Sequence, residues 1–197
     1  MELLNHRPVG LILLVGSILF LIAAFLPYSR VFAEPDPVAR LEILHQKRSM
    51  WNIGQLLFAL GSVITVLGLA IFYFNYRGSV PGNWVLIILL ILMIGALLWS
   101  WHCIERMISP EGFVNGTLTP RLFLLYSIFT QVGIIFFGVY LLGTNLSGWL
   151  GWMLIGGTAM ISVLMIVFKD MPPFVYYVFT LVLAIKLLAS AGETTSI

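Results

Sequence analysis

The sequence predicts an all-helical membrane protein that crosses the bilayer several times, and three observations carry this prediction. Of its 197 residues, 60% are hydrophobic and only 9% are charged, whereas soluble domains average about 45–50% and about 25%. The mean hydropathy is +1.05. The apolar residues gather in runs near the ~20 residues that a membrane-spanning helix needs. Because a soluble fold of this size cannot bury so much apolar surface, the composition excludes a soluble domain, a disordered chain and a nucleic-acid-binding protein.

Six apolar runs are the predicted spans, and we expect them to form a single integral membrane domain over residues 1–197. The runs are uninterrupted, which favours helices over barrel strands, whose apolar and polar residues alternate. Pro8, Pro120 and Pro173 each stand just before a run, where proline suits a helix start. The expected spans are residues 9–26, 52–75, 84–102, 122–142, 149–168 and 174–189.

A short amphipathic helix is predicted between the first and second spans. Asp36 followed by Pro37 has the pattern of a helix N-cap with a first-turn proline. Val38, Leu41 and Leu44 then recur at helical spacing. Two interpretations stay open: a separate helix that lies at the membrane surface, or an extension of the second span into water.

The distribution of Lys and Arg predicts the orientation in the cell membrane. Connections one, three and five hold seven of the ten cations, namely Arg30, Arg40, Lys47, Arg48, Arg106, Arg121 and Lys169. Cytoplasmic connections carry an excess of Lys and Arg. We therefore expect a multi-pass protein with connections one, three and five in the cytoplasm and both termini outside.

Glycines mark a packing face on the second span. Gly54, Gly61 and Gly68 recur every seven residues, close to two helical turns, and so form one groove of small residues. Such a groove lets another helix approach closely in lipid. We interpret it as an internal seam between two helices of the bundle, with self-association of two copies as the alternative.

The densest polar cluster lies at the cytoplasmic end of the third span. His102, Glu105 and Arg106 share one helix face by their spacing, and the predicted topology puts His45 on the same side of the membrane. His45 and His102 are candidate cofactor ligands and Glu105 is a candidate metal ligand, as in a haem- or metal-dependent redox enzyme. The plainer interpretation is a polar ring that anchors the helix to lipid headgroups, and a third is contact with an anionic-lipid or quinone headgroup. The sequence does not identify a cofactor.

Polar side chains at membrane depth are costly, so each one within a span is a candidate site. Gln131, Lys186 and Gln55 are the three candidates. If Lys186 faces the bundle interior near Gln131, the pair marks the route of a small-solute transporter. The alternative is that the lysine stem extends outward to the interface.

Catalytic motifs are absent from the sequence, which has neither a phosphate-binding P-loop nor a nucleophile elbow. The single cysteine, Cys103, rules out an intramolecular disulfide. With no catalytic residue to name, we favour a non-catalytic accessory or lipophile-binding membrane protein over an enzyme. Its expected partners are membrane lipids and either other membrane subunits or a second copy of the chain.

Two segments carry a resemblance to a known group. They are Arg7-Pro8-Val9-Gly10-Leu11 at the first span and the glycine- and tryptophan-rich stretch from Gly148 to Gly157 at the fifth. With the polar first connection and the glycine-marked second span, the layout resembles a family of uncharacterised small bacterial six-helix integral membrane proteins. The resemblance implies the architecture and a bacterial origin, and it implies no catalytic residues.

Overall fold

The protein is all-helical in the part of the chain that the computed structural model describes, which is residues 6–76, 82–118, 120–143, 148–167 and 174–193. Within these ranges there is no strand. Six long helices follow one another: α1 His6–Phe25, α3 Arg48–Tyr76, α4 Gly82–Ile108, α6 Pro120–Leu142, α7 Gly148–Val167 and α8 Phe174–Glu193. Their positions agree with the six apolar runs.

Membrane-spanning capacity differs among these helices. Four of the described helices are long and apolar enough to cross a membrane, over Arg7–Phe25, Arg48–Asn75, Trp84–Ile108 and Arg121–Leu142. The apolar parts of α7 and α8, Gly148–Val163 and Phe174–Ser190, are shorter. The chain is therefore a helical protein with several spans of membrane length.

Where the start of α3 meets the end of α4, both helices extend beyond the predicted spans. The second span begins at Arg48 instead of residue 52, and the third continues to Ile108 instead of ending at 102. The extension has a physical reason, because the last carbonyls of a helix need partners. Side chains of α3 supply them: Trp51 Nε1 donates to the Arg106 carbonyl at 3.1 Å, and an Arg48 Nη donates to the Met107 carbonyl at 2.6 Å.

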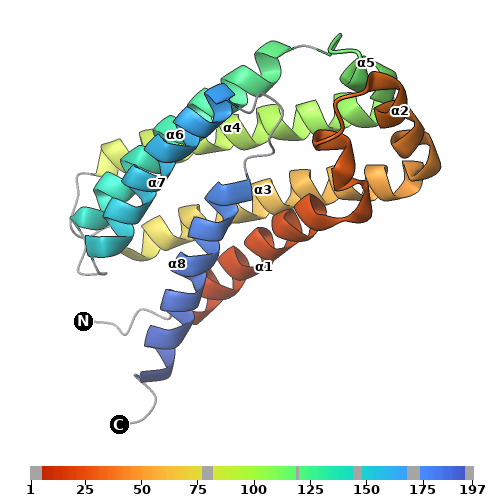
Figure 1. Cartoon of the computed structure of the whole chain (residues 1–197). Coiled ribbons are helices and arrows are strands. Elements are labelled where there is room, and N and C mark those ends of the chain that lie inside the picture. The colour runs from red at the N-terminus through yellow and green to blue at the C-terminus, as the bar shows by residue number, and fades with distance from the viewer. Residues whose placement is uncertain (1–5, 77–81, 119, 144–147, 168–173, 194–197) are drawn as a thin grey trace.

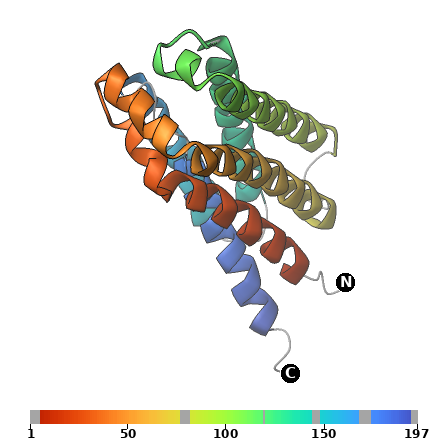
Figure 2. The same cartoon turned by 90° about the vertical axis from the view of Figure 1, so that its right-hand side faces the viewer.

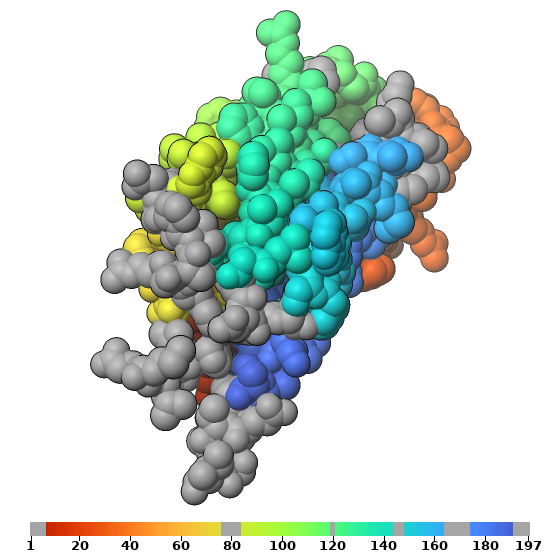
Figure 3. Space-filling view, turned by 90° about the vertical axis from the view of Figure 1, so that its left-hand side faces the viewer, coloured from red at the N-terminus to blue at the C-terminus, as the bar shows by residue number. Residues whose placement is uncertain are grey.

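The long helices pack side by side in the order α8, α1, α3, α4, α6, α7 (Figures 1 and 2). Helices α7 and α8 touch only lightly, at a place where the Phe179 ring lies against Gly157. Figure 3 shows α6 and α7 side by side over one face of the molecule. The outward faces carry large apolar side chains, as lipid-facing surfaces do.

The three glycines of α3 lie where this helix packs against α1 and against the turn that follows α1. A Cβ on Gly61 would stand 2.8 Å from the Gly16 carbonyl oxygen, and one on Gly68 would stand 2.7 Å from Leu13. Gly54 lies against the ring of Tyr28, just beyond α1. Gly61 thus allows backbone contact between α1 and α3 within one chain, while Gly68 makes room for the Leu13 side chain and Gly54 for the Tyr28 ring.

Three short helices cover one end of the bundle: η1 Pro27–Phe32, α2 Pro37–Gln46 and α5 Pro110–Val114 (Figure 1). Asp36 is the N-cap of α2 and accepts hydrogen bonds from the Val38 and Ala39 amides, with Pro37 in the first turn. The α-helical backbone is interrupted at Lys47 (φ −118°, ψ 28°). Of the two interpretations of this segment, the structure therefore favours a separate helix, and α2 packs on η1 and α5. We call η1, α2 and α5 the end cap.

Candidate functional site

A buried arginine surrounded by aromatic rings lies beneath the end cap. Arg106, in the last turns of α4, is 3% exposed. Its guanidinium carbon lies 4.7 Å from the ring centre of Phe113 in α5, 5.4 Å from that of Trp99 in α4 and 5.7 Å from that of Phe32 in η1. A cation over an aromatic face is attracted by the ring quadrupole, and more strongly where water is excluded. The charge of Arg106 thus ties α4 to two cap segments.

Phe113 also contacts a second arginine, Arg40, which belongs to the end cap. The guanidinium carbon of Arg40, in α2, lies 5.1 Å from the Phe113 ring centre. Trp51 of α3 is a further neighbour, with a centroid separation of 5.3 Å. One aromatic side chain therefore connects α2, α3, α4 and α5.

Tyr28 secures the start of the cap to the end of α1. Its hydroxyl donates to the Ala23 carbonyl at 2.7 Å, and its ring packs edge-on against Trp51 with a centroid separation of 5.3 Å. Burial raises the pKa of the Tyr28 phenol well above its ordinary value, because desolvation disfavours the phenolate. Tyr28 therefore acts here as a neutral hydrogen-bond donor.

The two histidines of the candidate ligand cluster have different surroundings. His102 is buried at 4% exposure, with its ring against Trp99 and Phe123 and its Nδ1 3.9 Å from Glu105 Oε2. His45 is exposed, and its Nε2 lies 3.4 Å from Glu111 Oε1 in α5. No group of three His, Cys, Asp or Glu side chains in the described ranges is arranged to hold a metal ion.

The burial of His102 and Arg106 contradicts the interpretation of this segment as a polar ring at the lipid headgroups. His102 and Arg106 both lie inside the protein, and only Glu105 of the three is partly exposed. Their common helix face is covered by α6 and the end cap, so it does not form a ring toward headgroups. Helical spacing correctly places the three residues together but does not indicate what packs against them.

The exposed contact between His45 of α2 and Glu111 of α5 has a clear electrostatic effect. The pKa of Glu111 is lowered, mainly because its own backbone N–H donates to the carboxylate and next because His45 does. Both interactions favour the charged carboxylate. At neutral pH, Glu111 is therefore a charged acceptor that links α5 to α2.

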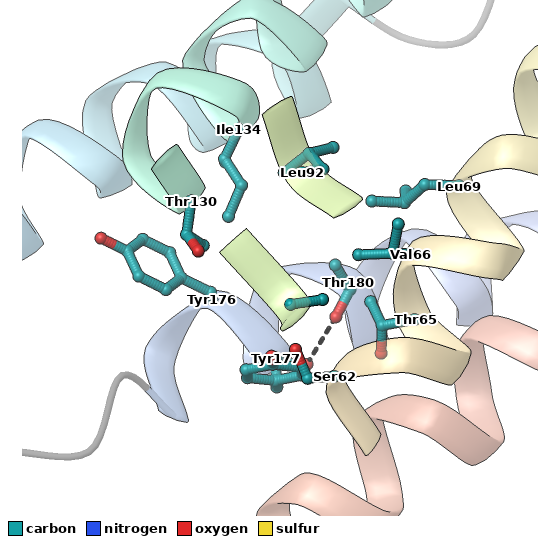
Figure 4. A pocket seen from close by; sticks show the side chains of 11 residues that line it. Ser62, Thr65, Val66, Leu69, Leu92, Thr130, Ile134, Tyr176, Tyr177 and Thr180 are labelled. Atoms are coloured by element: carbon teal, nitrogen blue, oxygen red, sulfur yellow. Dashed lines mark hydrogen bonds between the residues drawn. The ribbon is translucent and has the colours of Figure 1, made fainter. Parts of the chain in front are cut away.

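A second polar region lies inside the bundle, where a small cavity of about 30 Å³ opens between α3, α4, α6 and α8 (Figure 4). Hydroxyls line it from Ser62 and Thr65 of α3, Thr130 of α6, and Tyr177 and Thr180 of α8. Aliphatic side chains complete the wall, among them Leu69, Leu92 and Ile134. The cavity has room for a water molecule or two.

Hydrogen bonds and ring stacking join the helices around this cavity. The Ser17 and Thr180 hydroxyls lie 2.8 Å apart and connect α1 to α8. The rings of Phe20 and Tyr177 stack with a centroid separation of 3.5 Å. Thr65 is 4% exposed, and its hydroxyl has no hydrogen-bond partner in the described structure. This unpaired oxygen is a polar group that a bound water would satisfy.

The three intramembrane candidates separate in the structure. Gln131 accepts a hydrogen bond from the Ser162 hydroxyl of α7 at 2.9 Å. Lys186 is exposed on α8, as expected for a lysine whose stem extends outward. Gln55 is fully buried on α3, and neither of its amide atoms has a hydrogen-bond partner in the described structure.

The sequence reasoning missed the end cap in two places. It assigned no helix to the segments that form η1 and α5, and it assigned no role to Phe113. A signal for α5 was available: Ser109-Pro110-Glu111 has the same N-cap and first-turn proline pattern as Asp36-Pro37, and Ser109 does accept from the Gly112 amide. The meeting of Phe113, Phe32 and Arg106 has no local signal, because the three come from separate segments.

Comparisons with family models, with curated proteins and with solved structures find no match to this chain. Its function must therefore be inferred from the geometry above.

Proposed function

We propose that this protein is an integral membrane accessory or lipophile-binding protein without catalytic activity of its own. It acts through contacts of its helices with lipid and with other helices. In this proposal all six long helices cross the membrane, the end cap lies in the cytoplasm and both termini lie outside. The same proposal includes a bacterial origin.

The proposed topology is supported by the placement of the cations. Arg30, Arg40, Lys47 and Arg48 belong to the end cap or its junction with α3, and Arg106 lies directly beneath the cap. The same end of the bundle holds the start of α6, where Arg121 is exposed. An excess of Lys and Arg on one side is typical of the cytoplasmic side of a membrane protein.

The observation that carries the function is the extent of apolar surface on the outward helix faces. Helix α4 is the clearest case, with nine large apolar side chains at least 39% exposed: Trp84, Leu86, Ile87, Leu90, Met93, Leu97, Trp101, Ile104 and Ile108. A soluble monomer rarely exposes such a continuous surface. In a membrane it is covered either by acyl chains or by helices of a partner.

The interior cavity supports the lipophile-binding form of the proposal. Its wall has hydroxyls on some sides and aliphatic groups on others, and no charged residue lines it. That mixture suits a neutral head with a hydroxyl or carbonyl group. At about 30 Å³ the cavity is sized for water, so a larger head would have to displace side chains that line it.

Purification from native membranes in polymer nanodiscs tests the proposal. Mass spectrometry should find either enriched lipids or a stoichiometric membrane partner with the protein, compared with an unrelated multi-span protein extracted in parallel. A protein recovered without enriched lipid and without a partner would contradict the proposal. A haem spectrum, or a stoichiometric metal lost in His102→Ala, would favour the redox alternative.

No observation favours either alternative function, the redox enzyme or the small-solute transporter. The redox hypothesis needs His45, His102 and Glu105 together, and these histidines have different partners. The transporter hypothesis needs Lys186 near Gln131, but Lys186 is exposed on α8 and Gln131 is hydrogen-bonded to Ser162 of α7. Both remain hypotheses that the nanodisc experiment and a liposome uptake assay with Lys186→Met address.

A further inference from the structure

An open groove of about 450 Å³ lies where α2 meets α3. Three basic residues line it: His45 at the end of α2, Lys47 at the junction and Arg48 at the start of α3. Its apolar wall is formed by Met50 and Ile53 of α3, which are 36% and 54% exposed. We propose that this groove binds a phospholipid with an anionic headgroup from the surrounding leaflet. The inference deepens the proposed function and rests on the protein being embedded in a membrane.

The two permanent cations are held in place by neutral groups. The Lys47 ammonium donates to the Pro27 carbonyl at 3.3 Å, and Arg48 donates to the Met107 carbonyl. Within the described ranges neither cation has an ion pair with a carboxylate. Both side chains are therefore positioned without being neutralised, and each keeps donors for a phosphate.

The two acidic side chains near the groove, Glu111 and Glu42, do not line it. Glu111 of α5 is paired with His45, and Arg48 also acts on its charge. Glu42 of α2 accepts a hydrogen bond from Gln46 at 3.0 Å. The charged side chains that line the groove are therefore Lys47 and Arg48, with His45 adding a further positive charge when it is protonated. The balance is positive, which complements a singly charged phosphodiester.

The apolar wall continues along α3 in the direction that acyl chains take. Exposed side chains follow Ile53 at helical spacing down the outer face of α3: Leu56, Leu60, Val63, Leu67 and Ile71. A headgroup at Lys47 and Arg48 would therefore have its chains along this stripe. Basic pockets at the cytoplasmic ends of helices are where anionic lipids are expected to bind.

Native mass spectrometry of the full chain tests the inference, with phosphatidylglycerol and phosphatidylcholine of identical chains supplied in equal amounts. The wild type should retain phosphatidylglycerol preferentially. Lys47→Gln with Arg48→Gln should lower that preference by roughly five-fold for each charge removed. The matched control is Arg30→Gln with Arg121→Gln, which removes the same charge at the same end outside the groove, and it should keep the preference.

Two further variants keep the test decisive. Ser49→Glu adds a negative charge at an exposed groove residue without deleting a contact, and it should also weaken phosphatidylglycerol retention even if loss of the Arg48 bond impairs folding. Met50→Ser with Ile53→Ser should weaken retention of both lipids. Inorganic phosphate should not displace the lipid, since displacement would mean that the groove binds a soluble anion instead.

The outcomes separate this inference from the proposed function. If phosphatidylglycerol retention is equal in the groove variants and the control, the groove site is wrong while helix–lipid contact stands. If the wild type retains lipid without headgroup preference, the groove inference is wrong while the proposed function stands. If the wild type retains no lipid and no membrane partner, the proposed function fails as well.

Discussion

The guanidinium carbon of Arg106 lies 4.7 Å from the ring centre of Phe113, and both side chains are buried. Arg106 comes from α4, whereas Phe113 comes from the short α5 that follows it. A buried guanidinium is costly unless its surroundings compensate for lost water. The rings of Phe113, Trp99 and Phe32 provide part of that compensation, so the cap and the cation stabilise one another.

Replacing the aromatic ring of Phe113 with an aliphatic side chain should destabilise the end cap. Phe113→Leu removes the contacts with Arg106 and Arg40 and leaves a small void, so we expect a loss of about 1–2 kcal/mol in the free energy of unfolding. Denaturant titration in detergent micelles measures it. Phe136→Leu, at an outward position that is 44% exposed, is the matched control and should change the stability far less.

The α1–α3 seam should tolerate no added methyl group at Gly61. In Gly61→Ala the new Cβ would stand 2.8 Å from the Gly16 carbonyl oxygen and the Phe20 amide nitrogen, and backbone atoms cannot move aside cheaply. We expect a loss of about 1–3 kcal/mol. Gly156→Ala is the control, because beyond its own stretch of helix no heavy atom of the described structure lies within 4 Å of the added Cβ. Equal stability of the two variants would contradict the seam.

The Gln131–Ser162 hydrogen bond should contribute modestly to the packing of α6 on α7. Ser162→Ala removes the donor, and bonds of this kind between membrane helices average about 0.6 kcal/mol. Ser100→Ala is the control, since its hydroxyl bonds to the Ala96 carbonyl of its own helix. Denaturant titration of both variants should show the larger loss for Ser162→Ala, and the reverse order would argue against an interhelical role.

Acid should weaken the link between α2 and α5. The lowered pKa of Glu111 means that its charged form is favoured in the folded protein. Its contribution to stability is therefore complete above the ordinary carboxyl pKa of 4.5 and is lost as the pH falls through the lower folded value. Thermal midpoints measured from pH 7 to pH 3 should fall slightly more in the wild type than in Glu111→Gln. Identical pH profiles would show that the pair has no effect.

Local sequence patterns predicted the helices well and their tertiary roles poorly. The Asp36-Pro37 signature located the start of α2, and the apolar runs located the long helices, because capping and hydropathy act within a few residues. Burial of Arg106 could not be predicted in this way, since its partners lie in η1, α4 and α5. The same limit applies to His45 and Glu111, which come together only through the packing of α2 on α5.

Cysteine accessibility in intact cells tests the central claim, which is six crossings with the end cap in the cytoplasm. In a Cys103→Ser background, single cysteines are placed at Glu42, Asn115 and Asp170 on one predicted side and at Gly78, Gly143 and Thr195 on the other. A membrane-impermeant maleimide should label positions 78, 143 and 195 in intact cells and positions 42, 115 and 170 only after permeabilisation. Labelling of 143 and 170 from the same side would show that α7 does not cross, and labelling of 42 and 115 in intact cells would place the end cap outside.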